Sequence, residues 1–183
     1  MKTYNINWLY DKLNTEVIEY LFFWKPEKGT TVTGACLSQW TYSPFAVDNV
    51  CYLTTEHWMM AKKAELFGDK DICREILSTE SPAEVQILGK KVRNFDLTEW
   101  KKYQSGIVEE GNFYKFSQNE EMKSFLLDTG NKVLVEASPL DRIWGIGLSE
   151  ENENVNNPYL WKGTNLLGFA LMEVRDKLKK NCG

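Results

Sequence analysis

The sequence predicts a mainly helical α+β domain, and two observations support that prediction. Signals for helix starts and ends outnumber strand signals along the 183 residues, and the strand signals fall in small groups that do not alternate regularly with helices. The composition, with 43% hydrophobic and 26% charged residues, is that of an ordinary soluble globular chain. A chain of this size buries about 70% of its unfolded surface, so its core needs no disulfide or metal.

Three short segments have the pattern of strands. The aromatic run at residues 20–24 is rich in residue types that favour strands. Residues 45–53 alternate around Asp48-Asn49, which predicts a hairpin with that pair at its turn. Residues 133–136, Val-Leu-Val-Glu, form the third segment. These segments are too few for a large sheet and indicate a small β-sheet or hairpin.

Five helices are predicted from capping residues and apolar spacing. Ser81, followed by Pro82 and Glu84, is a capping box with proline at the first helical position. The other predicted starts are Thr54-Thr55 with an end at Gly68, Thr98, Asn119 with an end at Gly130, and Thr164 or Asn165. The polar segment 149–164 is expected to be a surface loop, not a linker, so residues 1–183 are interpreted as one domain.

Charge and the supply of metal ligands exclude several classes of function. The net charge of −4 argues against a protein that binds nucleic acid through a large net positive charge. A small local patch is still compatible with it, and the locally basic segment 90–102 could supply one. His57 is the only histidine, and the four cysteines are scattered without CxxC spacing. Zinc sites need closely spaced ligands, so no metal and no other cofactor is expected.

The sequence also predicts the cellular location of the protein. No run of eighteen apolar residues is present, so no membrane-spanning helix and no membrane partner are expected. Residues 1–7 lack the apolar core of a secretory signal. The absence of such a signal predicts a cytoplasmic protein whose cysteines are free thiols.

The helix predicted after Thr54 places two charged residues on its apolar face. At about 100° per residue, Lys63 falls about 20° from Glu56, and both lie in the middle of an apolar arc. Lys62 and Glu65 fall on the opposite face, where charges are normally solvated. An inward-facing carboxylate or ammonium must be paired or line a cavity, which perturbs its pKa and is typical of catalytic sites. The alternative is that Glu56 complements the helix N-terminus and Lys63 pairs with another acid.

Motifs in and beyond this helix match a known family. They are Ser43-Pro44-Phe45, Thr55-Glu56-His57-Trp58 with Lys63, Gly89 with Arg93, Lys115-Phe116, Leu126-Leu127 with Thr129-Gly130, residues 134–138, Asp141 with Ile143-Trp144-Gly145, and Gly163 with residues 165–168 and 171–175. With these motifs in order, the sequence resembles the NADAR superfamily of YbiA-like proteins over residues 20–178. Met60 and Lys62 stand where many relatives have polar residues such as glutamine.

The resemblance implies a YbiA-like domain and an enzyme that cleaves N-glycosidic bonds to ribose. Two activities are associated with the family. The first, favoured here, removes ADP-ribose from guanine bases in DNA or nucleotides. The second hydrolyses phosphoribosylamino-pyrimidine intermediates of riboflavin biosynthesis. The expected partners are therefore ADP-ribose or ribose-phosphate conjugates, with ADP-ribosylated DNA among them. The alternative from another class is a non-catalytic module that binds NAD or ADP-ribose.

The residues themselves fit this chemistry. Cleavage of an N-glycoside passes through a centre with oxocarbenium character, which a nearby carboxylate such as Glu56 stabilises. A desolvated lysine has a lowered pKa and can act as a neutral amine, which an imine with opened ribose requires. The resemblance implies such a lysine, and both Lys63 and Lys115 match the family pattern. Asp141 is a second candidate acid, although its segment is also typical of a turn.

The remaining candidates would bind substrate, and each has a structural alternative. His57 is either a catalytic base or substrate contact, or a core hydrogen-bonding residue. Phe45 and Trp144, the latter beside Gly145, could stack on a base or belong to the core. Arg93 and Lys115 could bind phosphate or be solvated. The helix start at Gly163-Thr164-Asn165 could hold a phosphate or be an ordinary cap.

Overall fold

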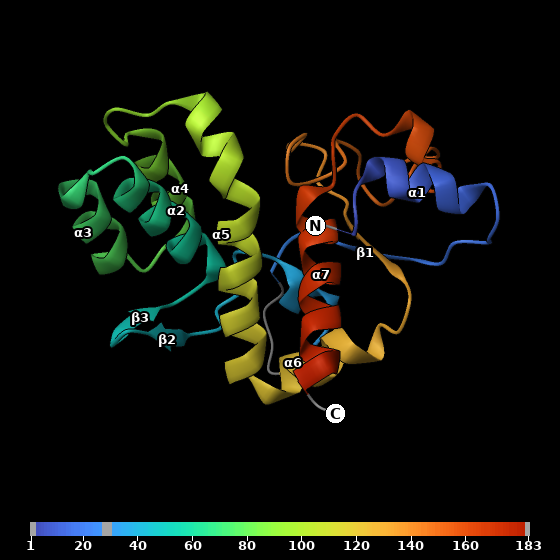
Figure 1. The fold of residues 1–183 in the computed structure, drawn as a ribbon, viewed down its shortest axis with the longest axis horizontal. Helices are drawn as coiled ribbons and strands as arrows, with labels where there is room; N and C mark the ends of the chain where they lie inside the picture. Colours follow the sequence, from blue (N-terminus) through green and yellow to red (C-terminus); the bar gives the residue numbers. More distant parts are fainter. Residues whose placement is uncertain (1–2, 27–30, 182–183) are drawn as a thin grey trace. The chain divides into compact units, whose positions relative to one another are not determined.

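The structure is a computed structural model that describes residues 3–26 and 31–181. Within these residues it has seven α-helices and four short strands, which confirms the mainly helical α+β class (Figure 1). The chain forms two compact units. The central unit comprises residues 39–120, and the terminal unit comprises residues 1–38 together with residues 121–183.

In the central unit, three helices pack against one buried helix. The helices are α2 (Thr55–Leu66), α3 (Lys70–Ser78), α4 (Pro82–Lys90) and α5 (Leu97–Gln118), and α2 contacts the other three. Strands β2 (Phe45–Val47) and β3 (Val50–Tyr52) form an antiparallel hairpin beside them. Figure 1 shows this hairpin below the short helices α2, α3 and α4.

Local signals explain most of these boundaries. Asp48 and Asn49 have φ angles of 50° and 65°, as the predicted hairpin turn requires. The side chains of Thr54 and Ser81 cap α2 and α4, as predicted. The predicted cap of α5 at Thr98 is wrong, because the Asp96 carboxylate accepts from the Glu99 N–H and starts the helix two residues earlier.

An aromatic cluster forms much of the core of the central unit. The ring of Trp58 packs against Phe45, Tyr52 and Tyr114, with centroid separations of 4.9 to 6.1 Å. The Trp58 Nε1–H donates to the Ile107 carbonyl at 2.8 Å. Helices α2 and α5 approach each other closely, because α5 has a glycine, Gly111, where a Cβ would lie 2.4 Å from the Trp58 ring.

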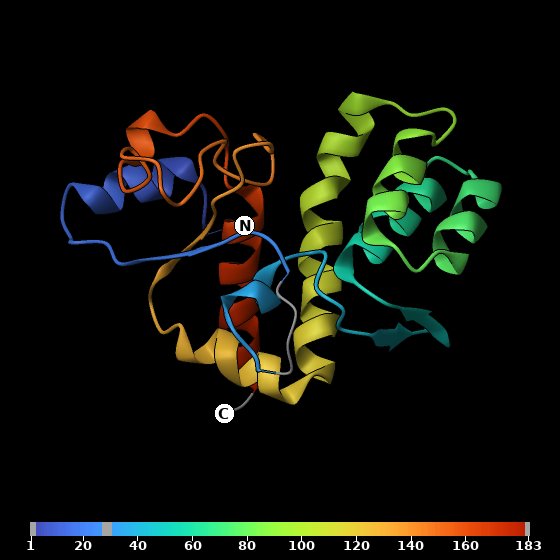
Figure 2. The same ribbon diagram turned by 180° about the vertical axis from the view of Figure 1, so that it is seen from behind.

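In the terminal unit, a two-stranded parallel sheet packs against the last helix. Strand β1 (Tyr20–Phe23) pairs with β4 (Val133–Glu136), and α7 (Leu166–Asn181) contacts β4. Helix α1 (Ile6–Leu13) contacts the 3-10 helix η2 (Pro158–Leu160), and Figure 2 shows the two beside each other. The other elements are the 3-10 helix η1 (Gly34–Leu37) and α6 (Glu120–Asp128).

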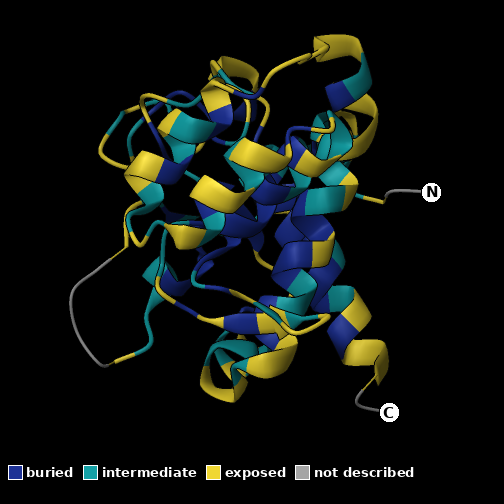
Figure 3. Ribbon diagram, turned by 90° about the vertical axis from the view of Figure 1, so that its left-hand side faces the viewer, coloured by how far each residue is buried: buried dark blue, intermediate teal, exposed yellow. Residues whose placement is uncertain are grey.

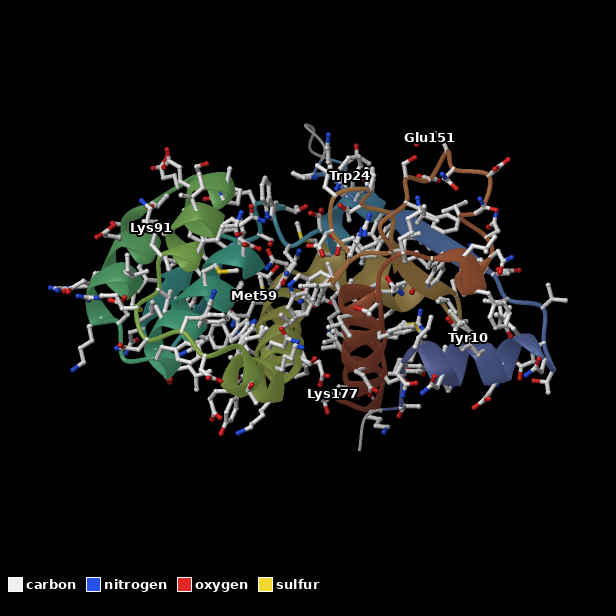
Figure 4. All side chains as sticks on the ribbon, turned by 90° about the horizontal axis from the view of Figure 1, so that it is seen from above. Tyr10, Trp24, Met59, Lys91, Glu151 and Lys177 are labelled. Carbon is white, nitrogen blue, oxygen red and sulfur yellow. The ribbon has the colours of Figure 1, made fainter. Side chains whose placement is uncertain are left out.

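Burial separates the interior of the terminal unit from its surface segments. Most of α7 is buried, whereas the ends of loops and the outer faces of helices are exposed (Figure 3). Segment 149–164 is a surface segment, as expected, with η2 as its regular element, and Glu151 lies at its outer edge (Figure 4). The described cysteines Cys36, Cys51 and Cys73 form no disulfide, and Cys182 lies outside the described residues. None of the described helices is long and apolar enough to cross a membrane.

Candidate functional site

Glu56 lies in the first turn of α2 and is buried, with 3% of its surface exposed. Its backbone N–H donates to the Gln39 carbonyl at 3.0 Å, and the Thr55 hydroxyl donates to the same oxygen at 3.3 Å. These bonds fix the start of α2 to the chain segment before the hairpin. A carboxylate in the first turn also interacts favourably with the helix dipole. The position of this buried acid is therefore determined by backbone hydrogen bonds.

Lys63 lies two turns further along α2 and is half-buried. Its ammonium donates to the Gly89 carbonyl at 2.7 Å and lies 4.2 Å from the centroid of the Phe95 ring. Burial lowers the pKa of Lys63, and the negative charge of Glu56 opposes that shift. Among the described residues no carboxylate lies at salt-bridge distance from Lys63, and its partners are this carbonyl and the aromatic rings of Phe95 and Trp100.

Close packing of α4 on α2 brings the Gly89 carbonyl to Lys63. A Cβ on Gly89 would lie 2.0 Å from the Met60 sulfur, so a larger residue there would displace the Met60 side chain. On the outer face of α2, Lys62 pairs with Glu65 at 2.8 Å. The inner face of α2 thus carries the buried Glu56 and the half-buried Lys63, and the outer face carries the Lys62–Glu65 ion pair, as the helical spacing predicts.

His57 has protein partners at both ring nitrogens. Nδ1 lies 2.8 Å from the Thr54 hydroxyl, and Nε2 lies 2.8 Å from the Thr79 carbonyl. A carbonyl only accepts hydrogen bonds, so Nε2 carries the proton and Nδ1 accepts from Thr54. Burial lowers the pKa of His57. This geometry corresponds to the core hydrogen-bonding alternative, in which His57 connects α2 to the end of α3.

Arg93 forms ion pairs with two acids at the start of α3. Its guanidinium donates to Asp69 from Nε at 3.0 Å and from Nη2, and Nη2 also donates to Asp71 at 2.8 Å. The Arg93 backbone N–H donates to Asp69 as well, at 2.9 Å. Asp69 is buried and caps α3 through the Ile72 N–H. Arg93 is thus exposed but ion-paired with both acids, and its role in binding phosphate stays a prediction.

The other two candidates of the central unit are in its interior. Lys115 on α5 is fully buried, with its ammonium 5.2 Å from the centroid of the Phe116 ring. Phe45 is also buried and belongs to the aromatic cluster around Trp58. The structure therefore gives Phe45 the core position that was the alternative to stacking on a base.

Asp141 lies at a turn in the terminal unit that its carboxylate helps to form. Asp141 Oδ1 accepts from the N–H groups of Ile143 and Trp144 at 2.7 and 2.8 Å. The Asp141 N–H donates to the Ser138 hydroxyl at 3.2 Å. Among the described residues, Asp141 Oδ2 has no hydrogen-bond partner. The acid is thus a turn-former through one oxygen, while the second oxygen is available for another contact.

The backbone N–H groups at the start of α7 bond to the loop that contains Asp141. The N–H groups of residues 164–167 donate to the carbonyls of residues 142–145 at 3.1 to 3.3 Å. The Asn165 side chain bonds to the backbone of β4, through Glu136 N–H at 3.0 Å and the Leu134 carbonyl at 2.9 Å. These partners occupy the donors that a phosphate at this helix start would need. Trp144 is half-buried, and a Cβ on Gly145 would lie 2.8 Å from the Glu136 carbonyl.

The predicted residues fall into two groups. The central unit holds Glu56, His57, Lys63, Arg93, Lys115 and Phe45, and the terminal unit holds Asp141, Trp144, Gly145 and Asn165. Within the central unit, the charge of Glu56 acts on the ammonium of Lys63. Within the terminal unit, backbone hydrogen bonds join all four residues to one loop and the start of α7.

Sequence reasoning missed several buried polar residues of the central unit. Gln39 anchors the start of α2, and no capping or periodicity signal marks it. Glu109 and Asn112 are buried on α5 together with Lys115. The spacing of these three residues places them within an arc of about 120°, so the same face test that found Glu56 could have found them. No group of three or more possible metal ligands occurs among the described residues.

Comparisons with known proteins agree with the resemblance. The NADAR domain family matches residues 22–179. N-glycosidase R617 of Acanthamoeba polyphaga mimivirus is 48% identical over 127 residues, which are 69% of this chain and 74% of that protein. N-glycosidase YbiA of Escherichia coli is 30% identical over 135 residues, 74% of this chain and 76% of the relative. The NMR structure of the Escherichia coli protein YbiA superposes with a TM-score of 0.69 at 25% identity, covering 90% of this chain and 89% of that one.

These relatives define the class of protein as a glycosidase, a hydrolase and not a non-catalytic module. The match over residues 22–179 is specific, and the chain belongs to the NADAR domain family. The fold confirms the expected YbiA-like architecture.

Proposed function

We propose that this chain is an N-glycosidase that removes ADP-ribose from guanine bases in DNA or nucleotides. The observation that carries the proposal is the pair of charged groups on the inner face of α2. Glu56 is buried at the start of the helix, and Lys63 is half-buried with a pKa that burial lowers. The N-glycosidase names of the relatives R617 and YbiA support the type of bond cleaved.

Glu56 would supply the electrostatic part of the reaction. As the bond between C1′ and the base nitrogen breaks, its electron pair goes to the base, and positive charge develops on the ribose. A desolvated carboxylate stabilises that charge far better than solvent does. The base takes up a proton, and the oxygen of water ends on C1′, so hydrolysis is balanced without a redox partner.

A lysine would act on the opened sugar. A neutral amine adds to the C1′ aldehyde and loses water to form an imine, which a second hydrolysis reverses. Lys63 is the preferred residue because its amine is held by one carbonyl hydrogen bond that can break, and because burial favours the neutral form. Lys115 is the competing residue, since it also matches the family pattern and is fully buried.

Product analysis of the purified protein tests this function. The protein would be incubated separately with ADP-ribosylated guanosine nucleotide, with an oligonucleotide that carries ADP-ribosylated guanine, and with a phosphoribosylamino-pyrimidine. Mass spectrometry is expected to find free ADP-ribose and unmodified guanine. Release of ribose 5-phosphate from the pyrimidine alone would assign the riboflavin-pathway substrate instead. Binding without turnover of all three would contradict catalysis.

A further inference from the structure

The amine of Lys63 is enclosed by two aromatic rings that differ in their exposure. Its nitrogen lies 4.2 Å from the centroid of the Phe95 ring and 5.8 Å from that of the Trp100 ring. Trp100 is buried, whereas Phe95 is 42% exposed. The Phe95 ring also packs edge-on against Phe67 at the end of α2, with the centroids 5.3 Å apart. Phe95 is thus the outer wall of the enclosure, at its boundary with solvent.

The backbone on both sides of Phe95 is fixed by hydrogen bonds. Phe95 belongs to the segment that connects α4 to α5 (Figure 1). Two residues before it, the Arg93 N–H donates to the Asp69 carboxylate at 2.9 Å. Directly after it, the Asp96 carboxylate accepts from the Glu99 N–H at 2.6 Å and caps α5. The position of the ring is therefore a property of the folded central unit.

The surroundings of the amine mostly favour its protonated form. The face of an aromatic ring attracts a cation, and the Gly89 carbonyl accepts an ammonium proton at 2.7 Å. The negative charge of Glu56 acts in the same direction, and burial acts against it. Among the described residues, the helices packed on α2 bring no charged group to salt-bridge distance, because the contact from α4 is the Gly89 carbonyl and the contact from α5 is the Trp100 ring. The Phe95 ring is the contact in this balance that a single substitution removes.

This arrangement has a consequence for the reactivity of Lys63. An amine that forms an imine must be neutral and must reach the aldehyde carbon. Lys63 therefore has to give a proton to water and leave both the Gly89 carbonyl and the ring before its electron pair adds to C1′. An aldehyde that binds as part of the substrate has binding energy to displace these contacts, whereas an aldehyde from solvent does not.

We propose that Phe95 is the positioning residue of Lys63, whose ring holds the ammonium beside the Gly89 carbonyl in the free enzyme and excludes aldehydes that are not bound as substrate. The inference rests on the proposed function, because it takes Lys63 to be the lysine that forms the imine. Phe95 acts through Lys63 and needs no contact with substrate. Its control over the amine is measurable in the absence of substrate.

Competitive labelling of lysines tests the control over the amine. Trace acetic anhydride would be applied to the folded protein at pH values from about 6 to 11, and peptide mass spectrometry would give the labelling rate of Lys63 in wild type and in Phe95→Leu. Leucine is apolar but has no aromatic face. The variant should therefore react about three- to tenfold faster at neutral pH, which corresponds to the loss of one cation–π contact, and the midpoint of its rate profile should move to lower pH.

Matched variants separate this effect from simple uncovering of the amine. Phe95→Tyr keeps an aromatic face and should keep the wild-type midpoint. Tyr103→Leu removes another exposed ring of the central unit and should leave Lys63 unchanged. The exposed Lys180 serves as an internal reference, and circular dichroism confirms that each variant is folded. A rate that rises equally at every pH, with an unmoved midpoint in Phe95→Leu, overturns the proposal.

Trapping of an unrelated aldehyde tests the exclusion. With glyceraldehyde and cyanoborohydride, Phe95→Leu should accumulate adduct on Lys63 about three- to tenfold faster than wild type, as its labelling rate predicts. Equal rates overturn the exclusion. Neither measurement requires hydrolysis of a conjugate, so the two proposals fail separately. Wild-type protein that hydrolyses no conjugate overturns the proposed function, whereas an active wild type with unchanged labelling in Phe95→Leu overturns only the role of Phe95.

Discussion

The central and terminal units hold their candidate acids in opposite ways. Glu56 lies on a helix, and its position is set by backbone bonds of the first turn of α2 while the carboxylate is directed into the buried side. Asp141 lies in a loop, and its carboxylate itself forms the turn by accepting two backbone N–H groups. Helical periodicity reveals the first acid from sequence, whereas the second is marked by the turn-like sequence around it, because its two bonds reach only two and three residues ahead.

The largest effect is expected at the helical acid. Glu56→Gln should keep the fold and lower kcat by on the order of 10² or more, because it removes charge stabilisation at the reacting centre. Steady-state kinetics on the conjugate and circular dichroism would measure both properties. Glu65→Gln, on the outer face of the same helix, is the control and should keep full activity. An active, folded Glu56→Gln protein would remove this acid from the mechanism.

Glycine substitutions compare the packing of the two units. Gly168→Ala should lower the free energy of unfolding by about 3 kcal/mol, since its Cβ would lie 2.0 Å from the Leu134 carbonyl. Gly106→Ala, in an open position on α5, should raise it by about 0.5–1 kcal/mol through helix propensity. Urea denaturation measures both. Equal effects of the two substitutions would show that the close approach at α7 is not a constraint.

The Arg93 ion pairs predict an acid dependence of stability in the central unit. Arg93 holds the pKa of Asp69 well below its usual range. An acid with a lowered folded pKa contributes stability above its unfolded pKa of about 4, and that contribution is lost as the pH falls further. Asp69→Asn should be less stable at neutral pH and less sensitive to acid below pH 4. Thermal melts across pH 2–7 would test this, and parallel curves for both proteins would contradict it.

Arg93→Gln separates its structural role from a substrate role. The variant should melt at a lower temperature and keep the wild-type KM for the conjugate, because the guanidinium is engaged by Asp69 and Asp71. A raised KM at unchanged melting temperature would show that Arg93 binds phosphate instead.

Substitution of His57 should produce the smallest effect, a change in the pH dependence of stability. Burial lowers its pKa, so the unfolded chain binds a proton more readily than the folded one. The stability from neutral His57 is complete above the unfolded pKa of about 6.5 and decreases as the pH falls below it. His57→Gln should remove this component from the pH dependence of chemical denaturation between pH 5 and 7. An unchanged profile would mean that the folded imidazole protonates as easily as the unfolded one.

The sequence predicted the fold where local signals are strong. The hairpin turn at Asp48-Asn49 and the caps at Thr54 and Ser81 are determined by nearby residues, and all three were found. Helices α1 and α3 were missed although the sequence offers a capping side chain for each, Asn5 and Asp69.

The candidate site was predictable to a similar extent. The inward face with Glu56 and Lys63 follows from helical spacing alone. The Gly89 carbonyl that binds Lys63 lies 26 residues away in sequence, and only the close packing of α4 on α2 brings it there. The two acids that bind Arg93 are in the same way brought to it by tertiary structure.

Borohydride trapping during turnover tests the central claim most directly. Reduction in the presence of the ADP-ribosylated conjugate would convert an imine into a stable adduct, and peptide mapping would locate it. The account predicts the adduct on Lys63, after its hydrogen bond to the Gly89 carbonyl is broken. An adduct on Lys115 alone would keep the chemistry but move it to α5. Turnover without an adduct on either lysine would contradict the imine and assign the reaction to direct hydrolysis by water.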